Sequence, residues 1–324
     1  MKPKTENEQT GARLTRDSFG RRIKKALYRD WELWFMLLIP IAYFLIFKYW
    51  PMFGLAIGFQ DYRLGDPFIS AQSNWVGLKW FKIFLQDPFL WRYIKNTLAL
   101  SVLELLIAFP AGIILALLIN EIRFPKFKSA VSNISILPHF ISMVVIVGML
   151  HTMFSVDGGL VNQLLMKMGF IEEPINFMAK SEYFRPLYIG SGMWAGCGFA
   201  AIVYTSAISG IDPALYEAAK MDGCSRVKAI LHITIPCILP TIVTMFILRC
   251  GSLMSVGYEK IILMYTESIY DVSETISTYV YENGVVGGQY SLTTAVGLFN
   301  SVCNIILLIS ANKISRKVTE TSMW

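Results

Sequence analysis

The sequence predicts an all-α integral membrane protein with six membrane-spanning helices. Of its 324 residues 54% are hydrophobic and only 16% are charged, whereas a soluble domain of this length contains roughly a quarter charged residues. The apolar residues also gather into runs of the roughly 20 residues that are needed to cross a bilayer. The chain is therefore expected to lie in a membrane, as a multi-pass protein.

The six predicted spans follow one another with polar segments between them. They cover residues 31–51, 97–119, 130–154, 186–208, 237–258 and 292–311. Residues 1–30 form a polar, basic tail before the first span, and residues 313–324 form a short tail after the last. No internal repeat is visible, which favours a single fold with one peripheral span.

The basic residues orient these spans. If the N-terminus is cytoplasmic, the inner segments carry 18 of the 29 lysines and arginines, the outer segments carry ten when Lys48 at the outer end of the first span is counted with them, and Arg249 lies inside a span. Because Lys and Arg concentrate in cytoplasmic loops, both termini and the polar segment 211–236 are expected in the cytoplasm. The net charge of +6 is thus explained by topology, and no nucleic-acid partner is expected, since no basic-aromatic motif accompanies it.

The segment between the fourth and fifth spans predicts a stiff helix-glycine-helix protrusion. Asp212 suits an N-cap, and Gly223 suits the left-handed residue that ends a helix, so residues 213–222 should be helical. Ser225 can cap a second helix, which Pro236 is expected to break. A protrusion of fixed shape on the inner side of a membrane protein is suited to the cleft of another protein.

The same segment resembles the EAA loop of permease subunits in binding-protein-dependent ABC importers. The shared pattern is Glu217-Ala218-Ala219, three residues, Gly223, nine residues and Ile233-Thr234-Ile235-Pro236, with Ile235 where the family has Leu. In that family the loop is a coupling helix seated in a groove of the ATPase subunit. The resemblance therefore implies that Glu217, Ala218, Ala219 and Gly223 contact an ATPase.

The resemblance extends along most of the chain. Residues 92–312 look like the five-helix, MetI-like core of importer permeases, to which residues 31–91 add a first span and an aromatic outer loop. Residues 257–300 resemble the LplB-like branch, related to maltose-type importers, which imports oligo- and polysaccharides. This implies a bacterial plasma membrane protein that pairs with a second permease, two ABC ATPase subunits and an extracytoplasmic solute-binding protein, with a carbohydrate as substrate.

Two charged residues within the predicted spans are candidates for the substrate pathway. A charge near the bilayer centre costs about 2.5–3.5 kcal/mol on insertion scales, so Glu104 and Arg249 should each face a partner or a wet cavity. Two interpretations stay open, a fixed strut in which they neutralise each other and a direct contact with substrate. A polar stripe with the same two interpretations comprises Ser252, Ser255, Tyr258, Asn300 and Asn304.

The sequence does not predict an enzyme. No GxxxxGK[ST] sequence is present, so ATP and magnesium are expected on the partner ATPase subunits. The five cysteines form no CxxC pair and the three histidines are isolated, so we expect no disulfide and no catalytic, cofactor or metal site. The acidic segment 259–290 is either an exposed outer loop or a docking surface for the binding protein. The alternative functions are import of another solute class and, less favoured, ion-coupled secondary transport.

Overall fold

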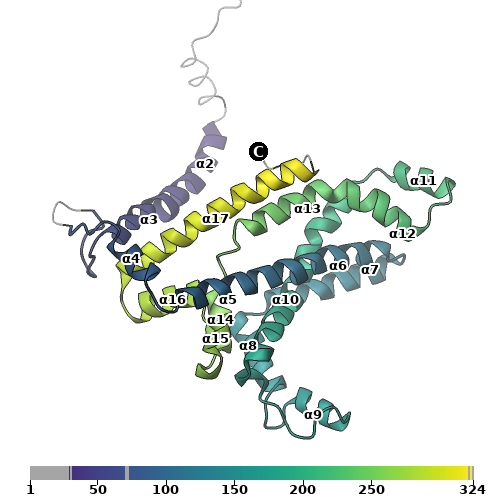
Figure 1. Cartoon of the computed structure of the whole chain (residues 1–324). Helices are drawn as coiled ribbons and strands as arrows, with labels where there is room; N and C mark the ends of the chain where they lie inside the picture. The colour runs from purple at the N-terminus through teal and green to yellow at the C-terminus, as the bar shows by residue number, and fades with distance from the viewer. Residues whose placement is uncertain (1–28, 30, 70–72, 320–321, 323–324) are drawn as a thin grey trace, which may run out of the picture. The chain divides into compact units, whose positions relative to one another are not determined.

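The computed structural model describes residues 29, 31–69, 73–319 and 322, and within these residues the regular secondary structure is helical (Figure 1). An isolated antiparallel bridge joins Gln60 to Trp75. The predicted all-α class is therefore confirmed. The basic tail expected at residues 1–30 lies outside the described residues except for Arg29. The contacts divide the chain into residues 1–55 and residues 56–324.

The first unit is one apolar helical segment. It contains α2 (Trp31–Phe44), the π-helical turn η1 (Leu45–Tyr49), α3 (Trp50–Met52) and the start of the 3-10 helix η2 (Phe53–Phe59). None of the described residues of α2, η1 or α3 is buried. Because lipid tails are as apolar as these side chains, an uncovered apolar surface of this length is suited to lipid contact.

The second unit contains the remaining helices. Their bounds are α4 (Lys79–Leu85), α5 (Leu90–Leu103), η3 (Glu104–Ala108), α6 (Phe109–Glu121), α7 (Pro125–Ile136), η4 (Leu137–Phe140), α8 (Met143–Met153), α9 (Leu160–Lys167), η5 (Phe177–Ala179), α10 (Ser181–Ser209), α11 (Pro213–Met221), α12 (Arg226–Ala229), η6 (Ile230–Thr234), α13 (Ile235–Cys250), α14 (Tyr258–Met264), η7 (Glu267–Ile269), α15 (Tyr270–Ser273), α16 (Ile276–Val280), η8 (Tyr281–Val286) and α17 (Tyr290–Thr319). Within this unit, α11 and α12 lie at the opposite end of the long helices from α16 (Figure 1).

Five described helical segments are long and apolar enough to cross a membrane: Trp31–Phe59, Leu90–Glu121, Ser181–Ser209, Arg226–Cys250 and Tyr290–Lys317. A sixth would consist of two pieces, Pro125–Phe140 and Met143–Met153, which meet at 95°. The span predicted at residues 130–154 is therefore present only as a bent pair of helices. The break follows Pro138, where Ser142 adopts an extended backbone and its hydroxyl caps a new helix by accepting from the N–H of Val145, 3.4 Å away.

Three π-helical turns each end two residues before a proline, namely Pro51, Pro110 and Pro236. Proline lacks an N–H and its ring clashes with the carbonyl four residues earlier. In the wider π-helical turn, the N–H of the residue before the proline bonds to the carbonyl five residues earlier. Phe109 bonds to Glu104 in this way, and Ile235 bonds to Ile230. The helix break predicted at Pro236 is consequently wrong, because η6 accommodates the proline and the helix continues from residue 226 to 250.

Small residues let α10 lie close to its neighbours α6 and α7. A Cβ on Gly112 would lie 2.9 Å from the Cβ of Ala200, and a Cβ on Gly198 would overlap the carbonyl oxygen of Ser135. Helices in lipid associate through such close packing because there is no hydrophobic drive between them. On the other side of the unit α17 packs against α13 and α4, and α10, α13 and the turn η3 together frame the cavity described below.

Candidate functional site

The helix-glycine-helix protrusion forms largely as the sequence predicts. The Asp212 carboxylate caps α11 by accepting from the N–H of Ala214 at 2.9 Å. The helix ends at Met221, one residue before the predicted end, and Gly223 follows with a φ of +73°. The N–H of Cys224 then bonds to the carbonyl of Ala219 at 2.9 Å, which closes the turn. Ser225 takes the N-cap position of α12 without a side-chain hydrogen bond.

The coupling candidates lie on the outer surface of this protrusion. Glu217, Ala218 and Gly223 are exposed, and Ala219 is half-buried. Met221, two residues after Ala219, is 88% exposed, which is unusual for a large apolar side chain. An exposed carboxylate beside an exposed methionine and alanines is a surface that a partner can cover.

A contact that the sequence did not reveal fastens α11 to the membrane helices. The hydroxyl of Tyr216 lies 2.9 Å from the Thr234 hydroxyl, at hydrogen-bond distance, and Thr234 is 1% exposed in the turn η6. Because η6 continues directly into α13, this contact joins α11 to the membrane-spanning part of the chain. The only signal for this contact in the sequence is that Tyr216 directly precedes Glu217.

The two charged candidates meet at a cavity. The guanidinium of Arg249 on α13 forms an ion pair with the carboxylate of Glu104 in η3, and both line two adjoining hollows of about 440 and 170 Å³. Glycine and aromatic residues of α10 and α6, including Gly192 and Phe109, line the larger hollow. Tyr188 lines the smaller one. The two charges neutralise each other, as the interpretation of a fixed strut requires. They also face open space, as the interpretation of a direct contact with substrate requires.

The polar stripe is divided in the structure. Ser252 lines both hollows and donates to the carbonyl of Arg249 at 3.0 Å, and Ser255 lines the smaller hollow. Asn304 fastens α17 to the segment after α13, because its amide donates to the Ser255 hydroxyl at 2.8 Å and accepts from the N–H of Met254 at 2.9 Å.

Two other candidates line neither hollow. Tyr258 stacks on Tyr281 with ring centroids 4.8 Å apart. The side-chain oxygen of Asn300 is buried and accepts no hydrogen bond from the described residues.

A second cation lies behind this cavity and was not predicted. Lys260 of α14 is 5% exposed, and its ammonium donates to the carbonyl of Tyr188 at 2.6 Å while lying 4.4 Å from the centre of the Tyr188 ring. Burial lowers the pKa of Lys260 to about 8, an effect that the nearby negative charge of Glu104 opposes. The sequence placed Lys260 in an outer loop, although the apolar run Ile261 to Met264 directly after it indicates burial.

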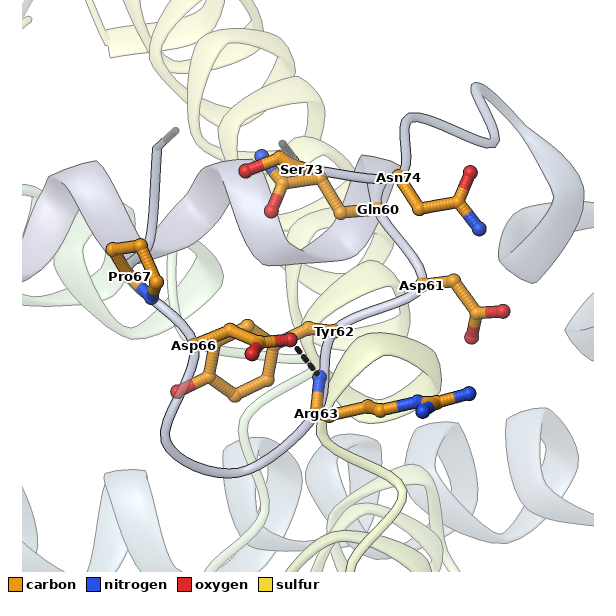
Figure 2. A pocket seen from close by; sticks show the side chains of 8 residues that line it. All are labelled: Gln60, Asp61, Tyr62, Arg63, Asp66, Pro67, Ser73 and Asn74. Carbon is orange, nitrogen blue, oxygen red and sulfur yellow. Dashed lines mark hydrogen bonds between the residues drawn. The ribbon is translucent and has the colours of Figure 1, made fainter. Parts of the chain in front are cut away.

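A polar hollow of about 310 Å³ lies in the segment before α4 (Figure 2). Its lining residues are Gln60, Asp61, Tyr62, Arg63, Asp66, Pro67, Ser73 and Asn74. The Ser291 hydroxyl at the start of α17 accepts from the N–H of Tyr62 at 3.0 Å, and the Trp80 indole donates to the carbonyl of Gln60 at 2.8 Å. The segment is thus attached to the ends of two helices.

Several carboxylates of the acidic segment 259–290 have partners within the chain. Glu274 pairs with Arg92 at 2.5 Å, Asp271 accepts from the Ser181 hydroxyl at 2.8 Å, and Glu282 accepts from the Tyr265 hydroxyl. Burial raises the pKa of Glu274, and Arg92 opposes the shift. Glu259 and Glu267 are exposed. Much of the acidic character of this segment therefore serves to hold its short helices in place.

The fold and these sites define a class, a multi-pass membrane protein in which a protruding loop is fastened to a helix that lines a charged cavity. Residues 108–320 match the family described as binding-protein-dependent transport system inner membrane component, and the chain belongs to this family. The predicted resemblance to importer permeases is thereby confirmed, and the chain is a multi-pass membrane component of a transport system.

Individual relatives match over nearly the whole chain. The polygalacturonan/rhamnogalacturonan transport system permease protein YteP of Bacillus subtilis (strain 168) is 42% identical over 94% of each chain. Protein LplB of the same organism is 40% identical over 92% of this chain and 93% of its own. A crystal structure of a bacterial alginate ABC transporter, in complex with an alginate pentasaccharide-bound periplasmic protein, contains a chain that is 42% identical with a TM-score of 0.83, covering 93% of this chain and 100% of that one. The likeness to LplB agrees with the predicted branch.

Proposed function

We propose that the chain is one permease subunit of an ATP-driven importer that moves oligosaccharides or polysaccharide fragments into a bacterial cell. Its expected partners are a second permease, two ABC ATPase subunits that bind ATP and magnesium, and an extracytoplasmic solute-binding protein. It has no catalytic role of its own. Supporting this assignment are a relative at 42% identity that is named as a polygalacturonan/rhamnogalacturonan transport system permease, and a related structure of an alginate transporter.

The observation that carries the proposal is the fastened protrusion. Glu217 lies exposed on α11, Tyr216 on the same helix bonds to Thr234, and Thr234 belongs to the continuous helix that reaches Arg249. A force applied to α11 therefore acts on a helix that lines the cavity. With the cytoplasmic orientation expected from the basic residues, α11 is available to an ATPase on the inner side of the membrane.

The proposed mechanism is alternating access driven through this rigid joint. Closure of two ATPase subunits around ATP displaces α11 and switches the paired permeases to an outward-facing arrangement. The binding protein docks on the outer side, where the segments 60–74 and 259–290 are the candidate contacts, and releases its saccharide. The saccharide passes the cavity lined by Glu104, Arg249, Ser252 and Ser255, and ATP hydrolysis resets the bundle.

The test is reconstitution of the complete complex in proteoliposomes. Import of a labelled oligosaccharide by the importer should require both ATP on the ATPase side and the loaded binding protein, and it should persist when proton and sodium gradients are collapsed. Import that stops with the ion gradients but continues without ATP would contradict the proposal.

That outcome would favour an ion-coupled secondary transporter, which needs a membrane-embedded site for the coupling ion. Glu104 is the carboxylate that the predicted spans offer for such a site, and its pairing with Arg249 leaves it poorly suited to binding a cation. The proposal therefore favours ATP as the energy source.

A further inference from the structure

Lys260 is a buried cation that the pairing of Glu104 with Arg249 leaves unmatched. In the part of the chain that the structure describes, no carboxylate lies within ion-pair distance of its ammonium. Removing an ammonium from water costs several kcal/mol unless it is compensated. One N–H of Lys260 is bonded to the Tyr188 carbonyl, and the Tyr188 ring covers a further side, which offsets part of that cost and fixes the position of the charge.

The Lys260 side chain lines neither hollow, but its ammonium lies directly beside Gly192, which lines the larger one. A Cβ built on Gly192 would lie 3.2 Å from the Lys260 nitrogen and 3.9 Å from a carboxylate oxygen of Glu104. Gly192 itself lines the larger hollow. Because glycine has no side chain, it leaves a window through which the Lys260 ammonium and the Glu104 carboxylate reach the same space.

The charges at this cavity do not cancel once Lys260 is included. Among the residues that line the two hollows, the formal charges are those of Glu104 and Arg249, and these two neutralise each other. Lys260 adds one positive charge immediately behind the wall, next to Gly192. A passing anionic group can therefore be bound without breaking the existing ion pair.

We propose that Lys260, acting through the window at Gly192, gives the permease a binding subsite for saccharides that carry carboxylates. This inference rests on the proposed saccharide import and names its substrate class as uronate-containing. The ammonium supplies a compact charge with a free donor, which suits a single sugar carboxylate. A neutral sugar at the same place would leave the ammonium without an anionic partner.

The experiment measures binding of two probes to the complete, detergent-solubilised complex by isothermal titration calorimetry. The probes are tetragalacturonate and its fully methyl-esterified form, which differ in charge and little in shape. Three variants are compared with the wild type: Lys260→Met removes the charge, Lys260→Arg keeps it, and Gly192→Ala places a methyl group in the window while Lys260 stays. The exposed outer lysine in Lys82→Met is the matched control.

The wild type and Lys82→Met should bind tetragalacturonate about tenfold more tightly than the ester. Lys260→Met and Gly192→Ala should abolish that preference, and Lys260→Arg should retain most of it. An unchanged preference in Gly192→Ala and in an assembled Lys260→Met, or none in the wild type, would overturn the inference and leave Lys260 as a strut between α14 and α10.

If the complex with Lys260→Met does not assemble, the affinity ratio of the two probes in Gly192→Ala alone decides whether Lys260 binds the sugar carboxylate. The binding measurement is independent of energy coupling. A complex that imports without ATP would therefore disprove the proposed function separately, while the ratio of the two affinities would still decide the role of Lys260.

Discussion

Arg249 and Glu104 form an ion pair although 145 positions of sequence separate them, and they do so on the wall of the cavity. The side chain of Arg249 is 48% exposed and that of Glu104 is 23% exposed. A strut that only held helices together would be covered by them. The partial exposure of both groups favours a pair that also contacts what passes through the cavity.

We expect Arg249→Met to lower ATP-driven saccharide import about tenfold, because it leaves the Glu104 carboxylate without its cation beside the substrate. Adding Glu104→Gln should restore the thermal unfolding midpoint of the complex, since no unpaired charge remains, but import should stay low. The measurements are initial uptake rates in proteoliposomes and thermal unfolding in detergent. A double variant that imports at the wild-type rate would assign the pair to a purely structural role.

Replacing the exposed carboxylate of the protrusion should uncouple the importer. We expect Glu217→Gln to reduce binding-protein-stimulated ATP hydrolysis about tenfold while the two hollows stay intact, because the substitution removes a charge from the surface proposed to contact an ATPase. Glu121→Gln, at the end of α6 and also expected on the cytoplasmic side, is the matched control. Equal hydrolysis in both variants and the wild type would remove Glu217 from the coupling contact.

The turn after α11 tests whether the shape of the protrusion matters. Gly223 has a φ of +73°, where a residue with a Cβ costs about 1–2 kcal/mol. Gly223→Ala should therefore shift α11 and lower stimulated ATP hydrolysis, by less than Glu217→Gln does. Gly210→Ala is the control, because its φ is −86° and its added Cβ would lie 3.5 Å from the nearest atom. If the two alanine variants hydrolyse ATP equally, a rigid turn is unnecessary for coupling.

The protrusion was predictable because its signals are local. Asp212 and Gly223 act on backbone groups within a few residues, so spacing alone indicated a capped helix and a left-handed turn. The long apolar helices were predictable for a similar reason, since composition and length decide them. The bend after Pro138 was missed because a count of apolar residues does not register where a helix restarts.

The cavity was only half predictable from the sequence. Charges inside apolar runs indicate function whatever the fold, which is why Glu104 and Arg249 could be named. Lys260 lies in a short helix between the spans, and although the apolar run after it hints at burial, the packing of α14 against its neighbours and the bond to Tyr188 are needed to place it beside the cavity. The continuous helix through Pro236 was likewise missed, because a π-helical turn has no simple sequence signal.

The attachment of the outer helices to α5 depends on Asn96, which is 1% exposed. Its amide donates to the carbonyls of Asp271 and Glu274 at 2.9 and 3.0 Å and accepts from Arg185 at 3.3 Å. Asn96→Ala leaves these groups unsatisfied and should destabilise the complex by about 2–4 kcal/mol, seen as a lower unfolding midpoint. The neighbouring exposed Lys95→Ala should leave the midpoint unchanged. Equal midpoints for the two variants would mean that water replaces the lost bonds.

The pH dependence of saccharide binding offers a separate test of Lys260. Burial lowers the pKa of Lys260 to about 8, so its charge is present below that pH and is lost as the pH rises through it, while the carboxylates of tetragalacturonate stay ionised. Affinity for tetragalacturonate should therefore be constant from about pH 6 to 7 and fall above about pH 8, and affinity for the methyl ester should not change.

The charged group that acts on Lys260 is Glu104 from η3, whose carboxylate is paired with Arg249 of α13, and Tyr188 of α10 supplies a carbonyl and a ring. Lys260→Arg separates their contribution from that of the lysine, because a guanidinium keeps its charge throughout this range. The decline with pH should disappear in Lys260→Arg and be absent, at uniformly weak binding, in Lys260→Met. If the affinity of Lys260→Arg for tetragalacturonate declined with pH as much as that of the wild type, a group other than Lys260 would have to titrate, because arginine does not lose its proton near pH 8.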